Sequence, residues 1–133
     1  MFRTSLASWL GAMSLALTVP ALAHHSFAMF DRDKEVTIVG TIKSFAWSNP
    51  HVWVDVLVAD DKNATQVWGL EAQSPAILYR GGWKQDSLKP DDRVTVVLHP
   101  MRDGTLGGQL MKVTLASGQV LNAGGAPDSR PAN

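Results

Sequence analysis

The chain has 133 residues with 12 basic and 12 acidic side chains, so its formal net charge at pH 7 is zero. A neutral chain without a basic run lacks the charge pattern of nucleic-acid-binding proteins. It contains no cysteine, which excludes disulfides and metal–thiolate sites, and its length suits one domain with a modest apolar core.

The first 23 residues have the pattern of a secretory signal peptide. Arg3 supplies a positive start, Leu6–Val19 a mostly apolar stretch, and Ala21-Leu22-Ala23 a small-x-small cleavage site. We expect a cut after Ala23, which leaves 110 residues with a formal net charge of −1 in the periplasm or outside the cell. A cut after Ala21 is the main rival. An uncleaved anchor is disfavoured, because the apolar run is shorter than a membrane span of about 20 residues.

After an irregular lead-in over Phe27–Lys34, alternating or β-branched patterns predict five strands and a short extension at Val120–Leu121. Gly40 inside the first of them indicates a bend or bulge. The core face of the fifth strand is expected to carry Met111, Val113 and Leu115. The five predicted strands are Val36–Phe45, His51–Val58, Thr65–Glu71, Arg93–His99 and Gln109–Leu115.

One short helix is predicted between the third and fourth strands, with Ser74 as its cap, Pro75 in its first turn and Gly81-Gly82 at its end. The order of three strands, one helix and two strands predicts an all-β fold, a small five-stranded OB-like Greek-key barrel. A β-sandwich would need about seven strands. We expect the barrel domain to span residues 24–121 and a disordered tail to span residues 122–133.

Short motifs along the mature chain resemble those of a family of small exported bacterial proteins known only as a domain of unknown function. The resemblance supports export and the domain limits, and it implies no catalytic residue. Such proteins usually carry glycine in a Pro-Gly-Asp turn where this chain has Asp91. The motifs are His24-His25-Ser26-Phe27, Trp47-Ser48-Asn49-Pro50-His51, Gly82-Trp83, Leu88-Lys89-Pro90-Asp91-Asp92-Arg93 and His99-Pro100-Met101-Arg102-Asp103-Gly104.

A cut after Ala23 would make His24 the first residue of the mature protein. Its α-amine and imidazole can then chelate one metal ion, and planar nitrogen donors favour Cu(II). We expect His99, or else His25, to complete the ligand set, because the end of the fourth strand should lie near the start of the first. After the rival cut, amine, amides and imidazole would form a different copper site. The alternative is that both adjacent histidines belong to an unstructured polar start.

A second candidate site lies on the outward face of the second and third strands, the usual ligand surface of OB folds. His51, Trp53, Asp55 and Trp68 are predicted to form a ligand-binding patch there. The alternative is a tryptophan pair that covers a seam of the barrel. Strand order places His51 at the opposite rim from His99.

The sequence contains no His-Glu-x-x-His, Gly-x-Ser-x-Gly or glycine-rich phosphate motif, so we do not expect an enzyme. It predicts an exported, periplasmic small binding protein that binds copper through its mature N-terminal histidine. The alternative is a non-metal interaction module for a peptide, glycan or envelope partner. We expect no nucleic-acid partner and no membrane span after signal cleavage.

Overall fold

The computed structural model describes residues 27–124 of the chain. All five predicted strands and the helix are present, with strand ends within two residues of the predicted ones. No helix of the described residues is long and apolar enough to cross a membrane. The elements are the 3-10 helix η1 (Phe27–Met29), β1 (Val36–Ala46), β2 (Trp53–Ala59), β3 (Thr65–Glu71), α1 (Pro75–Arg80), β4 (Arg93–Pro100), β5 (Gly107–Leu115) and β6 (Val120–Asn122).

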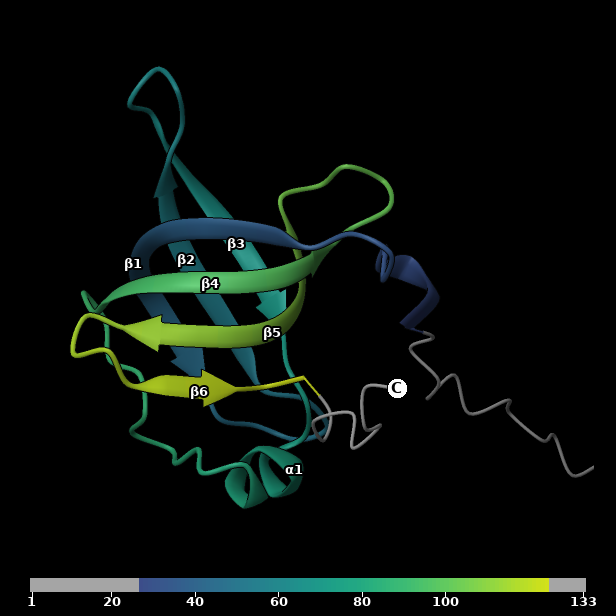
Figure 1. Cartoon of the computed structure of the whole chain (residues 1–133), viewed down its shortest axis with the longest axis vertical. Helices are drawn as coiled ribbons and strands as arrows, with labels where there is room; N and C mark the ends of the chain where they lie inside the picture. The colour runs from purple at the N-terminus through teal and green to yellow at the C-terminus, as the bar shows by residue number, and fades with distance from the viewer. Residues whose placement is uncertain (1–26, 125–133) are drawn as a thin grey trace, which may run out of the picture.

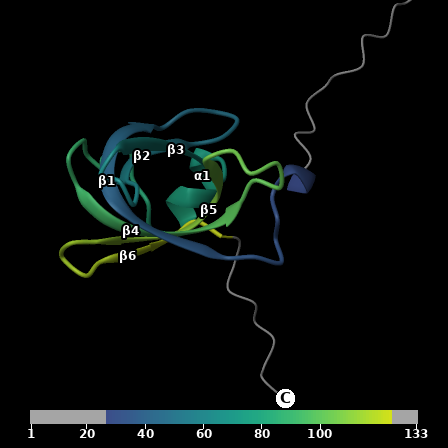
Figure 2. The same ribbon diagram turned by 90° about the horizontal axis from the view of Figure 1, so that it is seen from above.

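The strands form a sheet in the order β3-β2-β1-β4-β5-β6, and a parallel pairing of β3 with β5 closes five of them into a barrel. Figure 2 shows the closed ring from above, with α1 across its far end. The fold is therefore mostly strands with one short helix, a closed five-stranded barrel and one extra strand. This arrangement is consistent with the predicted OB-like Greek-key order.

β1 is long because it pairs with two neighbours, β4 along its first half and β2 along its second half. Gly40 stands where the strand changes partner, and a Cβ there would lie 2.3 Å from the carbonyl oxygen of Leu57. The register against β2 shifts between Ile42 and Ser44. The irregularity thus begins two residues after the glycine at which a bend or bulge was predicted, and one strand serves two sides of the barrel.

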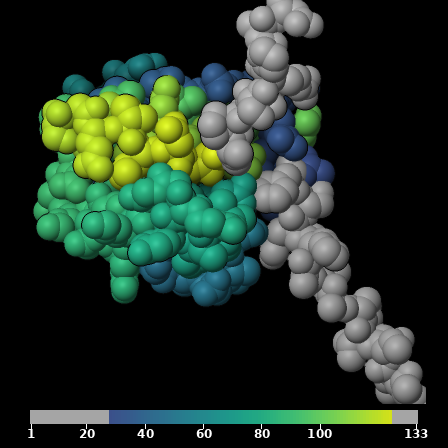
Figure 3. Space-filling view, turned by 60° about the horizontal axis from the view of Figure 1, so that its bottom comes forward, coloured from purple at the N-terminus to yellow at the C-terminus, as the bar shows by residue number. Residues whose placement is uncertain are grey.

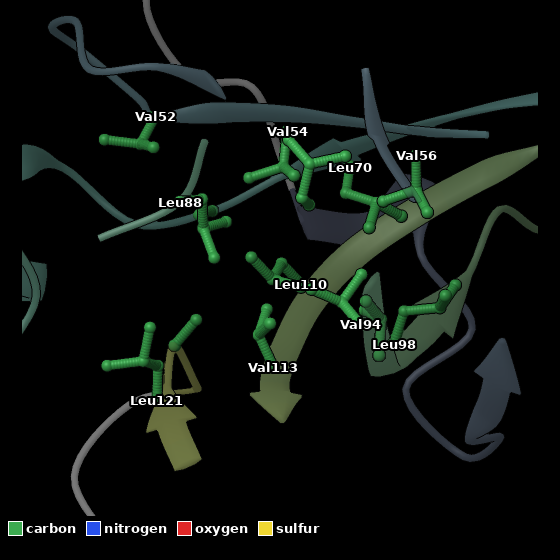
Figure 4. Packing of buried hydrophobic residues seen from close by; sticks show 14 of the residues in the cluster. Val52, Val54, Val56, Leu70, Leu88, Val94, Leu98, Leu110, Val113 and Leu121 are labelled. Atoms are coloured by element: carbon green, nitrogen blue, oxygen red, sulfur yellow. The ribbon is translucent and has the colours of Figure 1, made fainter. Parts of the chain in front are cut away.

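The core fills the barrel, and side chains from β2, β3, β4 and β5 point toward one another (Figure 4). The prediction for β5 was partly wrong, because Leu110 is fully buried and Met111 is only partly buried. A register shift against β4 between Val97 and Leu98 changes which β5 residues face inward. Val113, beyond the shift, faces the core as predicted.

Helix α1 closes one end of the barrel by inserting Leu78 into the core. The backbone N–H of Ile77 donates to Oγ of Ser74, so the predicted cap is confirmed. Trp83, just after the helix, is fully buried and donates its indole N–H to the carbonyl of Asn122 at 2.7 Å. From this end, the helix region in teal lies directly beside β6 in yellow (Figure 3).

The barrel domain reaches slightly further along the chain than predicted. Asn122 is the last residue of β6, and Ala123 is 2% exposed. The backbone N–H groups of Ala123 and Gly124 both donate to the carbonyl of Met111. The rest of the predicted tail, residues 125–133, lies outside the described residues.

Candidate functional site

A pocket of about 450 Å³ opens on the outer surface of the barrel. It lies where β2 and β3 meet the segment before β1 and the loop between β4 and β5, two segments that run side by side in Figure 1. The lining is mostly apolar but includes one histidine and one carboxylate. The lining residues that matter most for chemistry are Met29, His51, Trp53, Glu71, Met101 and Leu106.

The strand register explains why polar and aromatic groups face this pocket. Trp53 of β2 lies opposite Glu71 of β3, and the next pair along is Val54 with Leu70. Opposed residues in an antiparallel pair share a face, and successive residues alternate between faces. Val54 and Leu70 are fully buried in the core, so Trp53 and Glu71 face outward.

His51 and Glu71 form the polar centre of the pocket. Nδ1 of the histidine donates a hydrogen bond to Oε1 of the carboxylate. The Glu71 side chain is 7% exposed and the His51 side chain 23% exposed. A buried carboxylate needs such a donor, since it would otherwise lose its hydration without compensation. With the carboxylate as acceptor, Nδ1 of the ring carries a proton.

One wall of the pocket is the segment before β1, which pairs with the end of β4 instead of forming the expected irregular lead-in. Phe30 forms an antiparallel bridge with Met101 and is 3% exposed. The backbone N–H of Arg102 donates to the carbonyl of Met29 at 2.9 Å, and its Nε donates to the carbonyl of Ala28 at 3.1 Å. These bonds hold the segment before β1 against the end of β4, and each of the two segments contributes one methionine to the pocket lining.

The other wall is the loop between β4 and β5. Asp103 accepts hydrogen bonds from the backbone N–H and the hydroxyl of Thr105, at 2.9 and 2.7 Å, and these bonds lower the pKa of its carboxyl. The backbone N–H of Gly69 donates to the carbonyl of Leu106, which ties the loop to β3. At Gly107 a Cβ would lie 2.3 Å from the carbonyl oxygen of Gly69, so only glycine permits this approach.

The structure divides the patch predicted on β2 and β3. His51 and Trp53 line one pocket, but Trp68 lies opposite Val56 and packs against the core, so its predicted place beside Trp53 was wrong. Asp55 does face outward, where it accepts a hydrogen bond from the hydroxyl of Ser44 at 2.9 Å. The ligand-binding role of these residues stays a prediction.

His99 lies near the start of β1, as strand order predicted. Its Nδ1 donates to the carbonyl of Lys34 at 2.7 Å. The predicted separation from the His51 region was wrong, because Gln109 of β5 pairs with both His99 and Glu71. Two strand spacings put these backbones about 10 Å apart. The parallel closure of the barrel, which local patterns do not show, brings the two regions to one side.

Gln109 stands between these two regions on the outer face and is 9% exposed. Its Oε1 atom is buried and has no hydrogen-bond partner among the described residues. The same holds for the indole N–H of Trp68 on the inner face. Neither atom is satisfied by the part of the barrel that the structure describes.

The histidines predicted to start the mature chain, His24 and His25, lie outside the described residues. Within residues 27–124, no group of three or more histidine, cysteine, aspartate or glutamate side chains is placed to hold a metal ion. His99 is the one predicted copper ligand that the structure locates, and its metal role stays a prediction.

Sequence reasoning missed Glu71, Met29, Met101 and Leu106. Counting back from the hairpin after Ala59 would have paired Trp53 with Glu71 and shown a carboxylate beside His51. No local signal marks the two methionines, because they come from segments far apart in the sequence.

A family model described as a family of unknown function, DUF6152, matches residues 13–111. Neither a curated protein nor a solved structure matches the chain. The match covers most of the barrel and the motifs that carry the resemblance. The chain therefore belongs to the DUF6152 family.

Proposed function

We propose that the chain is an exported small binding protein whose ligand is a copper ion, bound where the mature chain begins beside the pocket. The observation that carries this proposal is the pairing of His51 with the buried carboxylate of Glu71. Histidines that bind metals usually donate their second ring N–H to a carboxylate or a carbonyl, which fixes the ring and makes it a better ligand. The pocket around the pair is apolar, as ligand sites commonly are.

The length of the chain supports a contribution from the terminus. His24 precedes Phe27 by three residues, which span at most about 10 Å when extended. Met29, two residues further on, already lines the pocket. A terminal His24 would supply its amine and imidazole, with His25 as a further donor, and the barrel would supply one more imidazole.

Two histidines of the barrel, His51 and His99, are candidates for this remaining imidazole ligand. His51 has the carboxylate of Glu71 behind its ring, and His99 has the carbonyl of Lys34. The sequence favoured His99 as the third copper ligand, whereas the structure favours His51, because His51 lines the pocket and His99 does not. Either ring would complete a nitrogen-rich set suited to Cu(II).

The test compares the exported protein, whose first residue is established by intact mass, with a form that carries one extra amino-terminal residue. Cu(II) affinity is measured by competition with a chelator of known affinity. We expect the extra residue to weaken binding roughly 100-fold or more, because the chelate loses its amine. Equal affinities would reject a terminal site.

His51→Gln and His99→Gln identify the third ligand in the same assay. Glutamine at position 51 keeps an N–H donor for Glu71 while removing the imidazole, so folding is preserved. If one variant binds Cu(II) roughly 10-fold or more weakly, the histidine that it lacks is the third ligand. Unchanged affinity in both would contradict any contribution from the barrel.

The second candidate is an interaction module for a peptide, glycan or other envelope partner. It is favoured by three apolar side chains at the outer surface beside the pocket: Trp53 is 46% exposed, Val67 41% and Leu106 43%. Trp53→Ser should then abolish capture of the partner, while Tyr79→Ser, at a still more exposed aromatic side chain on α1, should not. Capture that survives Trp53→Ser would count against this candidate.

A further inference from the structure

Two methionines from distant parts of the sequence line the same pocket as the His51 and Glu71 pair. Met29 lies before β1, next to Phe30 in the sequence, and Met101 lies directly after β4. Phe30 and Met101 form an antiparallel bridge. The described residues contain three methionines, and the third, Met111, lies in the middle of β5 beside Gly124. The pocket thus gathers two thioether groups and one imidazole.

We infer that this pocket is a Cu(I) site in which the thioethers of Met29 and Met101 and Nε2 of His51 are the ligands. The inference rests on the proposed function for the metal and adds its oxidation state and a ligand set within the barrel. Thioether sulfur is a soft donor that selects Cu(I) over harder ions, and imidazole suits copper in either state. This site needs no free amino terminus.

The backbone places the two methionines without fixing their side chains. The carbonyl of Met29 accepts from Arg102, and the backbone N–H of Met101 donates to the carbonyl of Gly107 at 3.2 Å. Methionine side chains have three rotatable bonds and adapt readily. Anchored backbones with adaptable side chains allow both sulfurs to close on an ion beside His51.

Charge and solvation also favour a soft monovalent ion. The carboxylate of Glu71 is buried, and its negative charge would be balanced by one positive charge in the pocket. The remaining lining is mostly apolar, with Phe30, Pro50 and Leu106, and its one hydroxyl, that of Thr105, is bonded to Asp103. A weakly hydrated cation loses less on entering such a lining.

Trp53 provides a cation–π contact to the bound ion and a fluorescence signal for its binding. It lines the pocket and faces outward on the same side of β2 as His51. An indole face near a cation contributes a cation–π attraction. Binding at this pocket should therefore change the fluorescence of Trp53, and Trp53→Phe should remove that change.

The decisive experiment measures Cu(I) affinity by anaerobic competition with a chromophoric Cu(I) chelator, using the mature protein with and without one extra amino-terminal residue. We expect each of Met29→Leu and Met101→Leu to weaken binding roughly 10-fold and the double variant at least roughly 100-fold. Leucine keeps the side-chain volume, so folding is preserved. Met111→Leu is the matched control and should leave the affinity unchanged, as should the extra residue.

A second readout uses Ag(I), a monovalent soft ion that is not reduced or oxidised in the assay. With methyl-labelled methionine, Ag(I) should shift the methyl signals of Met29 and Met101 and leave that of Met111 in place. Shifts confined to Met111, or a double variant that binds Cu(I) as tightly as Met111→Leu, would overturn the Cu(I) site. The proposed function would survive that result if one extra amino-terminal residue still weakened Cu(II) binding, and would fall with it if the extra residue left Cu(II) binding unchanged.

Discussion

The two faces of the β2 and β3 pair are built from alternate residues of the same strands, yet they differ in what covers them. The inner face carries Val54, Val56 and Leu70, each fully buried by other strands of the barrel. The outer face carries Trp53, which is 46% exposed, beside Glu71, which is 5% exposed. Neighbouring outward positions on one face therefore have opposite environments.

The difference teaches that burial on the outer face comes from the connecting segments. Glu71 lines a pocket whose walls are the segment before β1 and the loop after β4. Those segments are held by backbone bonds between residues 29–31 and 100–102. The inner face makes the barrel stable, and the outer face becomes a site only where these segments lie over it.

Removing core volume should have the largest effect on stability. Leu110→Ala, at a fully buried position of β5, is expected to lower the free energy of unfolding by about 3 kcal/mol, because it leaves a cavity. Leu106→Ala, on the pocket loop and 43% exposed, should cost less than about 1 kcal/mol. Urea unfolding measures both. Similar losses would contradict the distinction between the two faces.

Breaking the polar pair of the pocket should have the next largest effect. His51→Ala leaves the buried carboxylate of Glu71 without its donor and should cost about 2 kcal/mol. Adding Glu71→Leu should recover most of this loss, since the uncompensated charge is gone. The same urea titration checks both variants. A double variant less stable than His51→Ala would show that the carboxylate has a second structural role.

A turn that belongs to neither face gives a smaller effect. Asp91 has φ of 73°, and the backbone N–H of Asp92 donates to the carbonyl of Lys89, with Pro90 between them. This is a turn that favours glycine at position 91, as its relatives are expected to have. Asp91→Gly should be more stable than Asp91→Ala by about 1 kcal/mol in thermal or urea unfolding. Equal stabilities would mean that the turn relaxes.

The smallest effect is a loosening of the pocket wall in acid. A hydrogen bond from Lys34, at 3.1 Å, and the positive charges of Lys34 and Arg102 lower the pKa of Asp31 below 3.8. The stabilisation from Asp31 is therefore present above pH 3.8 and is lost as the pH falls through the lower pKa of the folded state. Methionine methyl signals should show Met29 changing before the core does.

Asp31→Asn is the control for this pH step. Asparagine cannot titrate, so the signal of Met29 should no longer change in that range while the core still unfolds at its own pH. An unchanged pH profile in the variant would assign the step to another group.

The strands of the barrel could be predicted because each is indicated by a short pattern in the sequence. Alternation from Val52 to Val58 and the Ser74-Pro75 start of the helix are signals within a few residues. The candidate site could be predicted only in part. His51 and Trp53 were found, Trp68 was placed on the wrong face, and Glu71 was missed because its neighbour across the hairpin follows only from the register.

The sequence by itself determined the composition limits, the strand and helix order and the likeness to its family, since these depend on short-range patterns. Only the tertiary structure decided that Met29, His51, Glu71 and Met101 share one pocket and that His99 lies two strands from Glu71. The physical reason is closure of the barrel. The parallel pairing of β3 with β5 joins residues almost forty positions apart, and no local preference encodes such a contact.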